Sequence, residues 1–388
     1  MRLLVPIAFL FLSLGCSEYA FLEDGNIDQP YDSQDDGTDG PDATDGTGST
    51  DIDNDDNNNG IPDDEEDPDT TTGGPGGPTG TGQTPPGDPM GDVEGRVCGP
   101  DGVTWLAYAT VTVDTPVGIF VTTTDAGGYF TLMDLPVGTW DLTIEKGSWS
   151  TTWPIGITDG GLYDLALDEC VRIIQDDTTI AVVTGEYDHI EDILDSMGVS
   201  YDLYDGLGVG GTNLLLDPGL MAQYDIIFFN CGMDFGWVAF EAQVGTNLAT
   251  YVNNGGSVYA SDWSYYLIEA AYPGYIDFYG DDNTAFDAFV GDWGDVSANV
   301  VDPGMQAVNG GASATVGFTY NMWAAASSTT DEVLVSASYP LMTGGTTSGP
   351  LATRGQFGSG HIVYTAFHNE AQATLDMEAL LTEMVHSL

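Results

Sequence analysis

The chain has 388 residues, with 5 Lys or Arg against 61 Asp or Glu, and a formal net charge of −56. Binding to nucleic acid depends on clustered Lys and Arg, so this composition excludes nucleic acid as a partner. Electrostatic attachment to anionic lipid also needs basic clusters, so any attachment to a membrane must be covalent.

The first 16 residues have the pattern of a secretory signal. Arg2 precedes an almost unbroken apolar run from Leu3 to Leu14, and Gly15 and Cys16 follow. The run is shorter than the roughly 20 residues that span a bilayer. The segment LSLGC resembles the lipobox of bacterial lipoproteins, although Ser13 stands where Leu is usual. This resemblance implies that 1–16 is a signal peptide and that Cys16 carries the lipid; an ordinary signal with an incidental Cys is the alternative.

Lipidation at Cys16 would anchor the exported chain to the cell envelope, because each buried methylene contributes about 0.8 kcal/mol. Ser17 and Glu18 lack the Asp that is typical of inner-membrane retention. We expect the outer membrane, on its periplasmic or its cell-surface face.

The segment 17–92 contains no Lys or Arg and is dominated by Asp, Gly, Thr, Pro and Asn. Such a composition buries too little apolar surface to offset the entropy lost on ordering. The segment is therefore predicted to be a disordered acidic stalk.

One part of the stalk matches the spacing of a calcium loop, D-x-[DN]-x-[DN]-G-x5-E. Oxygen ligands at the first, third, fifth, ninth and twelfth positions, and a backbone carbonyl at the seventh, suit Ca²⁺, and Gly60 permits the turn. The predicted ligands are Asp55, Asn57, Asn59, Ile61, Asp63 and Glu66. DNNNGIPDDEE resembles the aspartate-rich calcium repeats of thrombospondin type 3. A chance match of acidic sequence is the alternative, and calcium is the one cofactor that the sequence indicates.

The segment 93–170 has short alternating runs separated by turn signals, which predict a small antiparallel β-sandwich. The predicted strands are 110–113, 119–123, 129–132 and 140–144. Four Cys in an exported chain leave three after lipidation. Cys98 and Cys170 bracket this domain and form the predicted disulfide, which leaves Cys231 free.

The stretch TTTDAGGYFTLMDLPVGTWDLTI, with GRVC and AYATVTV before it, resembles the carboxypeptidase regulatory-like domain. That family has a transthyretin-like β-sandwich and is not catalytic. The resemblance implies a structural or adhesive role for this domain.

In the segment 171–388, strands and helices alternate, which predicts a doubly wound α/β domain with a parallel sheet. Predicted strands cover 179–183, 199–203, 225–229, 257–260 and 361–365, and predicted helices cover 190–197, 240–252, 264–271 and 372–386. Between 275 and 351 we expect inserted strands, among them 332–336.

Three stretches of this segment, QYDIIFFNCG, GGSVYASDWSYYLI and YTAFHNE, resemble class I glutamine amidotransferase-like proteins, whose sheet is flavodoxin-like. The resemblance implies that Cys231 and Gly232 lie in the oxyanion loop. It implies that His368 and Glu370 are the partners of the nucleophile in a catalytic triad.

The position of the family's nucleophilic Cys is occupied by Asp262. A thiolate attacks carbonyl carbon readily, whereas a carboxylate gives an easily reversed anhydride. This departure favours an envelope protein with a non-catalytic binding or scaffolding role, whose ligand is a carbohydrate or an envelope protein. A periplasmic or surface hydrolase that uses Asp262, His368 and Glu370 on carbohydrate or peptidoglycan is the alternative.

Three further interpretations stay open. Asp262, His368 and Glu370 could bind a metal. Cys231 could replace the nucleophile or be a buried structural thiol. Four aromatic residues could stack on a sugar or pack in the core, namely Trp237, Trp263, Tyr265 and Tyr266.

Overall fold

The computed structural model describes residues 88–388 except 166–169, 176–177 and 371–373. These described residues belong to one compact unit. The predicted signal peptide with Cys16, the calcium ligands and all but the last five residues of the predicted stalk lie outside the described residues. Within the described part of the chain, no helix is both long enough and apolar enough to cross a membrane.

The first folded part consists of two four-stranded sheets. One sheet contains β1 (Met90–Cys98), β4 (Tyr129–Pro136), β7 (Leu162–Asp164) and β8 (Val171–Arg172), and the other contains β2 (Thr110–Thr115), β3 (Gly118–Thr123), β5 (Gly138–Lys146) and β6 (Trp149–Ile157). The strand β1 begins inside the segment predicted as stalk, and β8 lies just beyond the predicted domain boundary at residue 170. Most pairs are antiparallel as predicted, but β7 and β8 run parallel to β1.

Alternation along the strands explains this sandwich. In β1 and β2 every second side chain is buried, as expected for strands with one face on a core. Val93 and Val97 of the first sheet and Val111 and Leu142 of the second belong to that core. The predicted disulfide is confirmed: Cys98 and Cys170 are bonded, with their Cα atoms 5.6 Å apart. Cys231 is a free, buried thiol.

The second folded part is built on a nine-stranded sheet in the order β10-β9-β11-β12-β21-β20-β19-β15-β16. The first five strands are parallel: β10 (Asp202–Tyr204), β9 (Ile180–Val183), β11 (Ile226–Phe229), β12 (Ser257–Ser261) and β21 (Gly360–Thr365). The other four pair in antiparallel fashion: β20 (Thr346–Phe357), β19 (Glu332–Pro340), β15 (Gly294–Val300) and β16 (Ser313–Phe318). The predicted inserted strands therefore extend the main sheet.

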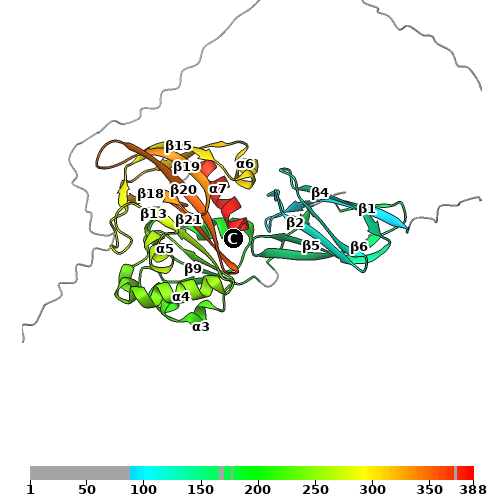
Figure 1. Cartoon of the computed structure of the whole chain (residues 1–388), viewed down its shortest axis with the longest axis horizontal. Coiled ribbons are helices and arrows are strands. Elements are labelled where there is room, and N and C mark those ends of the chain that lie inside the picture. The colour runs from blue at the N-terminus through cyan, green and yellow to red at the C-terminus, as the bar shows by residue number, and fades with distance from the viewer. Residues whose placement is uncertain (1–87, 166–169, 176–177, 371–373) are drawn as a thin grey trace, which may run out of the picture. The chain divides into compact units, whose positions relative to one another are not determined.

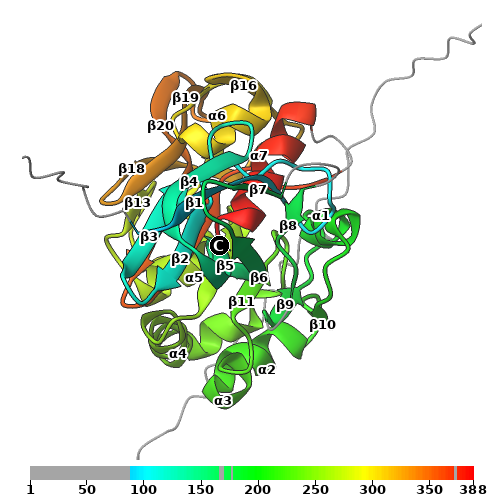
Figure 2. The same ribbon diagram turned by 90° about the vertical axis from the view of Figure 1, so that its right-hand side faces the viewer.

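Helices cover both faces of the parallel half (Figures 1 and 2). The helix α1 packs against α7, whereas α2 and α5 pack against α4. Their bounds are α1 (Ile190–Met197), α2 (Gly210–Leu216), α3 (Pro218–Met221), α4 (Glu241–Asn253), α5 (Tyr265–Ala271), α6 (Pro303–Asn309) and α7 (Leu375–His386), with short 3-10 turns η2 (Phe235–Phe240) and η3 (Asp262–Ser264). In α1 the four apolar residues at helical spacing are all buried, and Gly198 ends the helix with φ 71°.

Continuous apolar runs explain why the parallel strands lie at the centre. All residues of β9 and β11 are buried, which is typical of strands covered on both faces. Two small antiparallel pairs complete the fold: β13 (Ile276–Phe278) with β18 (Ala326–Thr329), and β14 (Phe289–Gly291) with β17 (Trp323–Ala324). Both pairs belong to the region predicted to hold inserted strands.

Candidate functional site

Three loops meet at the carboxyl ends of the parallel strands, where α/β sheets bind their ligands. Cys231 lies two residues beyond β11, Asp262 directly follows β12, and His368 lies three residues beyond β21. The structure brings the side chains of these three residues together. Gly232, the second predicted oxyanion-loop residue, is buried with φ 88°.

Asp262 occupies a tight turn between β12 and α5. Its φ of 41° is uncommon for a residue other than glycine, and its side chain is buried. The backbone N–H of Ala324 donates to Oδ1 at 2.6 Å. The other oxygen, Oδ2, lies 3.5 Å from Sγ of Cys231 and 3.5 Å from Nε2 of His368. Both carboxylate oxygens are therefore already in contact with protein groups.

A second buried carboxylate, Asp188, supports this cluster and was missed from the sequence. Oδ2 of Asp188 accepts from the hydroxyl of Ser261 at 2.5 Å, and Oδ1 accepts from the backbone N–H of Asn369 at 3.0 Å. Oγ of Ser261 in turn accepts from the backbone N–H of Cys231 at 2.9 Å. The available signal was the position of Asp188 in the loop after the first parallel strand.

These contacts set the charges of the site. Burial alone would lower the pKa of His368, but its contact with Asp262 and the charge of Asp188 raise that pKa to about 9. Burial raises the pKa of Asp188 to about 6, although the nearby His368 and Ser261 oppose the shift. Burial and the charge of Asp262 raise the pKa of the Cys231 thiol well above its usual range. At neutral pH the imidazole is therefore protonated and Cys231 is a thiol.

Glu370, the third residue of the predicted triad, lines a small cavity together with Asp262 and His368. The cavity has a volume of about 40 Å³, which is space for one or two water molecules. Burial raises the pKa of Glu370, and His368 opposes this rise.

The chemistry that this arrangement offers at neutral pH is limited. A general base must be unprotonated near the working pH, whereas His368 carries a proton. A thiol must ionise to attack, and Cys231 is 1% exposed with a raised pKa. The group with metal-ligand spacing consists of Cys231, Asp262 and His368, so Cys231 takes the place that was predicted for Glu370.

Three of the four aromatic residues that could stack on a sugar belong to the core. Trp237, Tyr265 and Tyr266 are each at most 1% exposed, so core packing explains them. Trp263 is half-buried, and its indole N–H donates to the carbonyl of Met322 at 2.8 Å.

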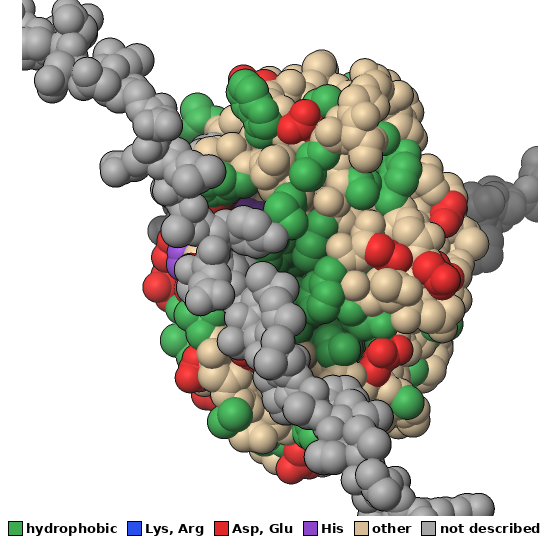
Figure 3. Space-filling model, turned by 90° about the vertical axis from the view of Figure 1, so that its left-hand side faces the viewer, with side chains coloured by type: hydrophobic (Ala, Val, Ile, Leu, Met, Phe, Trp, Pro, Cys, Tyr) green, Lys and Arg blue, Asp and Glu red, His purple; other side chains and the backbone are tan. Residues whose placement is uncertain are grey.

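Trp263 belongs instead to a row of rings at the surface. Hydrophobic side chains form a band on the face of the protein that Figure 3 shows. Consecutive rings of the row have centroids between 4.6 and 6.5 Å apart. This aromatic row consists of Phe235, Phe286, Phe289, Trp263, Tyr187 and Tyr320. Phe286 and Tyr320 are 44% and 56% exposed, so the row is open to a ligand.

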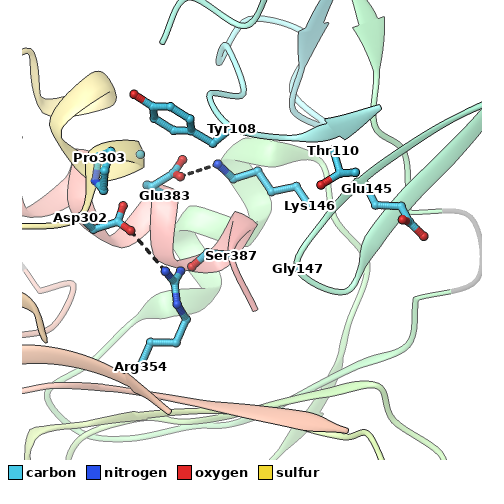
Figure 4. Close-up of a pocket in the computed structure, with 11 residues that line it drawn as sticks. Tyr108, Thr110, Glu145, Lys146, Gly147, Asp302, Pro303, Arg354, Glu383 and Ser387 are labelled. Carbon is cyan, nitrogen blue, oxygen red and sulfur yellow. Dashed lines mark hydrogen bonds and ion pairs between the residues drawn. The ribbon is translucent and has the colours of Figure 1, made fainter. Parts of the chain in front are cut away.

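A larger cavity, of about 610 Å³, lies where the tip of the β5–β6 hairpin meets α6, α7 and β20. Lys146 points toward Glu383 and Arg354 toward Asp302, at 2.5 and 3.2 Å (Figure 4). These two cations are among the five basic residues of the chain, and both are neutralised by carboxylates. The cavity therefore offers no free positive charge to an anionic ligand.

Comparison with known proteins leaves the family of this chain open. No family model matches the sequence, and no curated protein matches it. A cytoplasmic protein from Salmonella typhimurium is similar to 54% of this chain over 97% of its own length, with 16% identity and a TM-score of 0.36. A β-galactosidase from Bacillus circulans sp. alkalophilus is similar to 54% of this chain over 30% of its own length, with 13% identity and a TM-score of 0.32.

Proposed function

We propose that this chain is a lipid-anchored protein of the bacterial cell envelope whose folded part is a non-catalytic binding or scaffolding module. The apolar start with Cys16 supports export and lipidation. The acidic segment that follows would hold the folded part away from the membrane, because like charges along a linker extend it.

We infer a flavodoxin-like fold of the class I amidotransferase-like kind for the second folded part. Its five parallel strands have the spatial order 2-1-3-4-5 when numbered along the chain, which is the flavodoxin-like order. The loop positions of Cys231, Asp262 and His368 agree with this inference. The paired four-stranded sheets and the TTTDAGGYF stretch support a carboxypeptidase regulatory-like sandwich before it.

The state of His368 carries the non-catalytic part of the proposal. In a triad, a neutral imidazole takes the proton of the nucleophile. Here the imidazole is protonated beside a carboxylate whose two oxygens already have partners. The site therefore holds a buried ion pair where an amidotransferase would hold a thiolate and a base.

We propose a neutral glycan of the envelope as the ligand and the aromatic row as its binding surface. Aromatic rings offer flat apolar area at a low cost in conformational entropy. With a net charge of −56, the protein repels polyanions, so an uncharged sugar chain fits this surface better.

The test is retention of the full chain on purified peptidoglycan and on insoluble neutral polysaccharides. We expect Phe286→Ala and Tyr320→Ala each to weaken retention about three- to tenfold, since each removes a stacking surface. Trp153→Ala is the matched control, because Trp153 is an exposed aromatic residue of the sandwich. Equal retention of all variants would show that glycans do not bind at the aromatic row and would favour an envelope protein as the ligand.

Anchoring is tested separately by cell fractionation. We expect the unaltered chain in the membrane fraction of the envelope and Cys16→Ala in the soluble fraction. If Cys16→Ala stays in the membrane fraction, the lipid-anchor proposal is wrong.

Hydrolysis through Asp262, His368 and Glu370 is the second candidate function. The positive φ of Asp262 favours it, because strained residues at a strand–helix turn cluster at active sites. Turnover of glycoside, ester or amide substrates that is lost in both Asp262→Asn and His368→Ala would establish this activity. It would overturn the non-catalytic proposal.

A further inference from the structure

Three different ligand types meet in the cluster at the carboxyl ends of β11, β12 and β21. The atoms are Sγ of Cys231, an oxygen of Asp262 and a ring nitrogen of His368, and all lie within 4.8 Å of one another. Each comes from a different loop of the sheet edge, so the fold itself holds them together.

The separations suit a shared ion. The ion pair between Nε2 of His368 and Oδ2 of Asp262 spans 3.5 Å, which is longer than the 2.7 to 3.2 Å of an ordinary N–H···O hydrogen bond. Tetrahedral zinc with bonds of about 2.0 to 2.3 Å places neighbouring ligand atoms roughly 3.3 to 3.6 Å apart. Oδ2 of Asp262 lies 3.5 Å from both Sγ of Cys231 and Nε2 of His368.

The surroundings of the cluster are rich in negative charge. Asp188, Asp262 and Glu370 all lie close enough to influence the single imidazole of His368. The amide of Ala324 fixes Oδ1 of Asp262 and so orients Oδ2 toward the other two ligands.

We propose that Cys231, Asp262 and His368 bind one Zn²⁺ ion. Thiolate and imidazole ligands suit zinc, whereas Ca²⁺ and Mg²⁺ take oxygen ligands. On binding, the thiol proton of Cys231 and the proton on Nε2 of His368 pass to solvent. A water molecule in the adjacent cavity of about 40 Å³, which Asp262 and His368 line, would complete the tetrahedron.

Cobalt is the optical probe for this site. A thiolate bound to Co²⁺ gives a charge-transfer band in the near ultraviolet, which carboxylates do not give. Co²⁺ ions that bind only to carboxylates elsewhere on the acidic chain therefore do not contribute to this band. We expect the unreduced full-length chain to develop this band with one equivalent of Co²⁺ and to lose it when Zn²⁺ is added. Absence of the band in the unaltered protein overturns the proposal, whatever the variants do.

Variants assign the ligands. We expect Cys231→Ser to remove the band, and Asp262→Asn and His368→Ala to weaken zinc binding at least about tenfold. Glu186→Gln is the matched control, since Glu186 is an exposed acid in the loop after β9, and it should bind zinc like the unaltered protein. A band that survives Cys231→Ser, or equal zinc affinity in all variants, overturns the assignment. The zinc site and the aromatic row use different residues, so failure of either leaves the other standing.

Discussion

His368 holds its proton because Asp262 and Asp188 lie beside it. An ordinary His has a pKa near 6.5, whereas His368 has a pKa of about 9 in the folded chain. The folded state therefore binds this proton more tightly than the unfolded state does. The resulting stabilisation is fully present below pH 6.5 and is lost as the pH rises toward 9. Its size is up to about 3 kcal/mol.

We predict that the free energy of unfolding of the metal-free protein falls between pH 6.5 and 9, and that His368→Asn flattens this fall. The measurement is urea denaturation across that range. His189→Asn is the matched control, because it removes an imidazole whose side chain is exposed. A profile of His368→Asn that parallels that of the unaltered chain would contradict the proposed ion pair.

For the individual residues of the site, the sequence indicated which side chains lie near one another but not which charges they carry. Cys231, Asp262 and His368 could be placed together because each follows a predicted parallel strand, and such ends share one edge of the sheet. Asp188 could not be recognised from its type, since its importance comes from complete burial beside Ser261. Burial of that kind depends on the whole tertiary structure.

Among the elements, the disulfide joins the end of β1 to the residue just before β8. It closes a loop with a sequence separation of 72 residues. In a chain-entropy account, such a crosslink stabilises the folded state by about 4 kcal/mol, because it restricts the unfolded chain.

We therefore predict that replacing both Cys98 and Cys170 by Ser lowers the free energy of unfolding of the sandwich by about 4 kcal/mol. Guanidinium denaturation followed by tryptophan fluorescence measures this change. Reduction of the disulfide in the unaltered chain is the matched comparison and should lower the free energy of unfolding by a similar amount. An unchanged unfolding midpoint in the double variant would contradict the prediction.

Elements with strong periodicity were predictable from the sequence, and elements that depend on distant neighbours were not. The helix at 190–197 matches α1, because four apolar residues at helical spacing and a terminal Gly define it. The strand β20 begins in the region predicted to hold inserted strands, but it was not placed individually, since Pro350, Gly349 and its Thr and Ser residues obscure the alternation of a strand. It is a strand because β19 and β21 pair with both of its edges. The strand β6 was missed for a similar reason, since it contains Pro154 and Gly156.

For the molecule as a whole, the hairpin of β5 and β6 connects the sandwich to α7. Nζ of Lys146 contacts Glu383 at 2.5 Å and the carbonyl of Ala107 at 2.6 Å, and both charged side chains are buried. The indole N–H of Trp149 donates to the carbonyl of Val385 at 2.9 Å. Removing one partner of a buried ion pair leaves the other charge buried without a partner, which costs about 3 to 5 kcal/mol.

We predict that Lys146→Met destabilises the protein by about 3 to 5 kcal/mol and that adding Glu383→Leu restores most of this loss. Urea denaturation gives both values.

We also expect Lys146→Met to separate one unfolding transition into two, for the sandwich and for the α/β part. The single Glu145→Gln variant, one residue away on the same strand with an exposed side chain, is the control. Additive losses in the double variant would contradict the proposed pairing.

The scarcity of basic residues has a practical consequence for proteases that cut after Lys or Arg. Of the four such residues in the described structure, Lys146 is buried, Arg354 is held by Asp302 and Glu332, and Arg96 stacks on Trp105 at 3.2 Å. Arg172 is exposed and lies at the junction between the sandwich and the α/β part. Brief trypsin digestion of the native protein should therefore cut the folded portion first after Arg172, and the two halves should stay associated as long as Lys146 contacts Glu383.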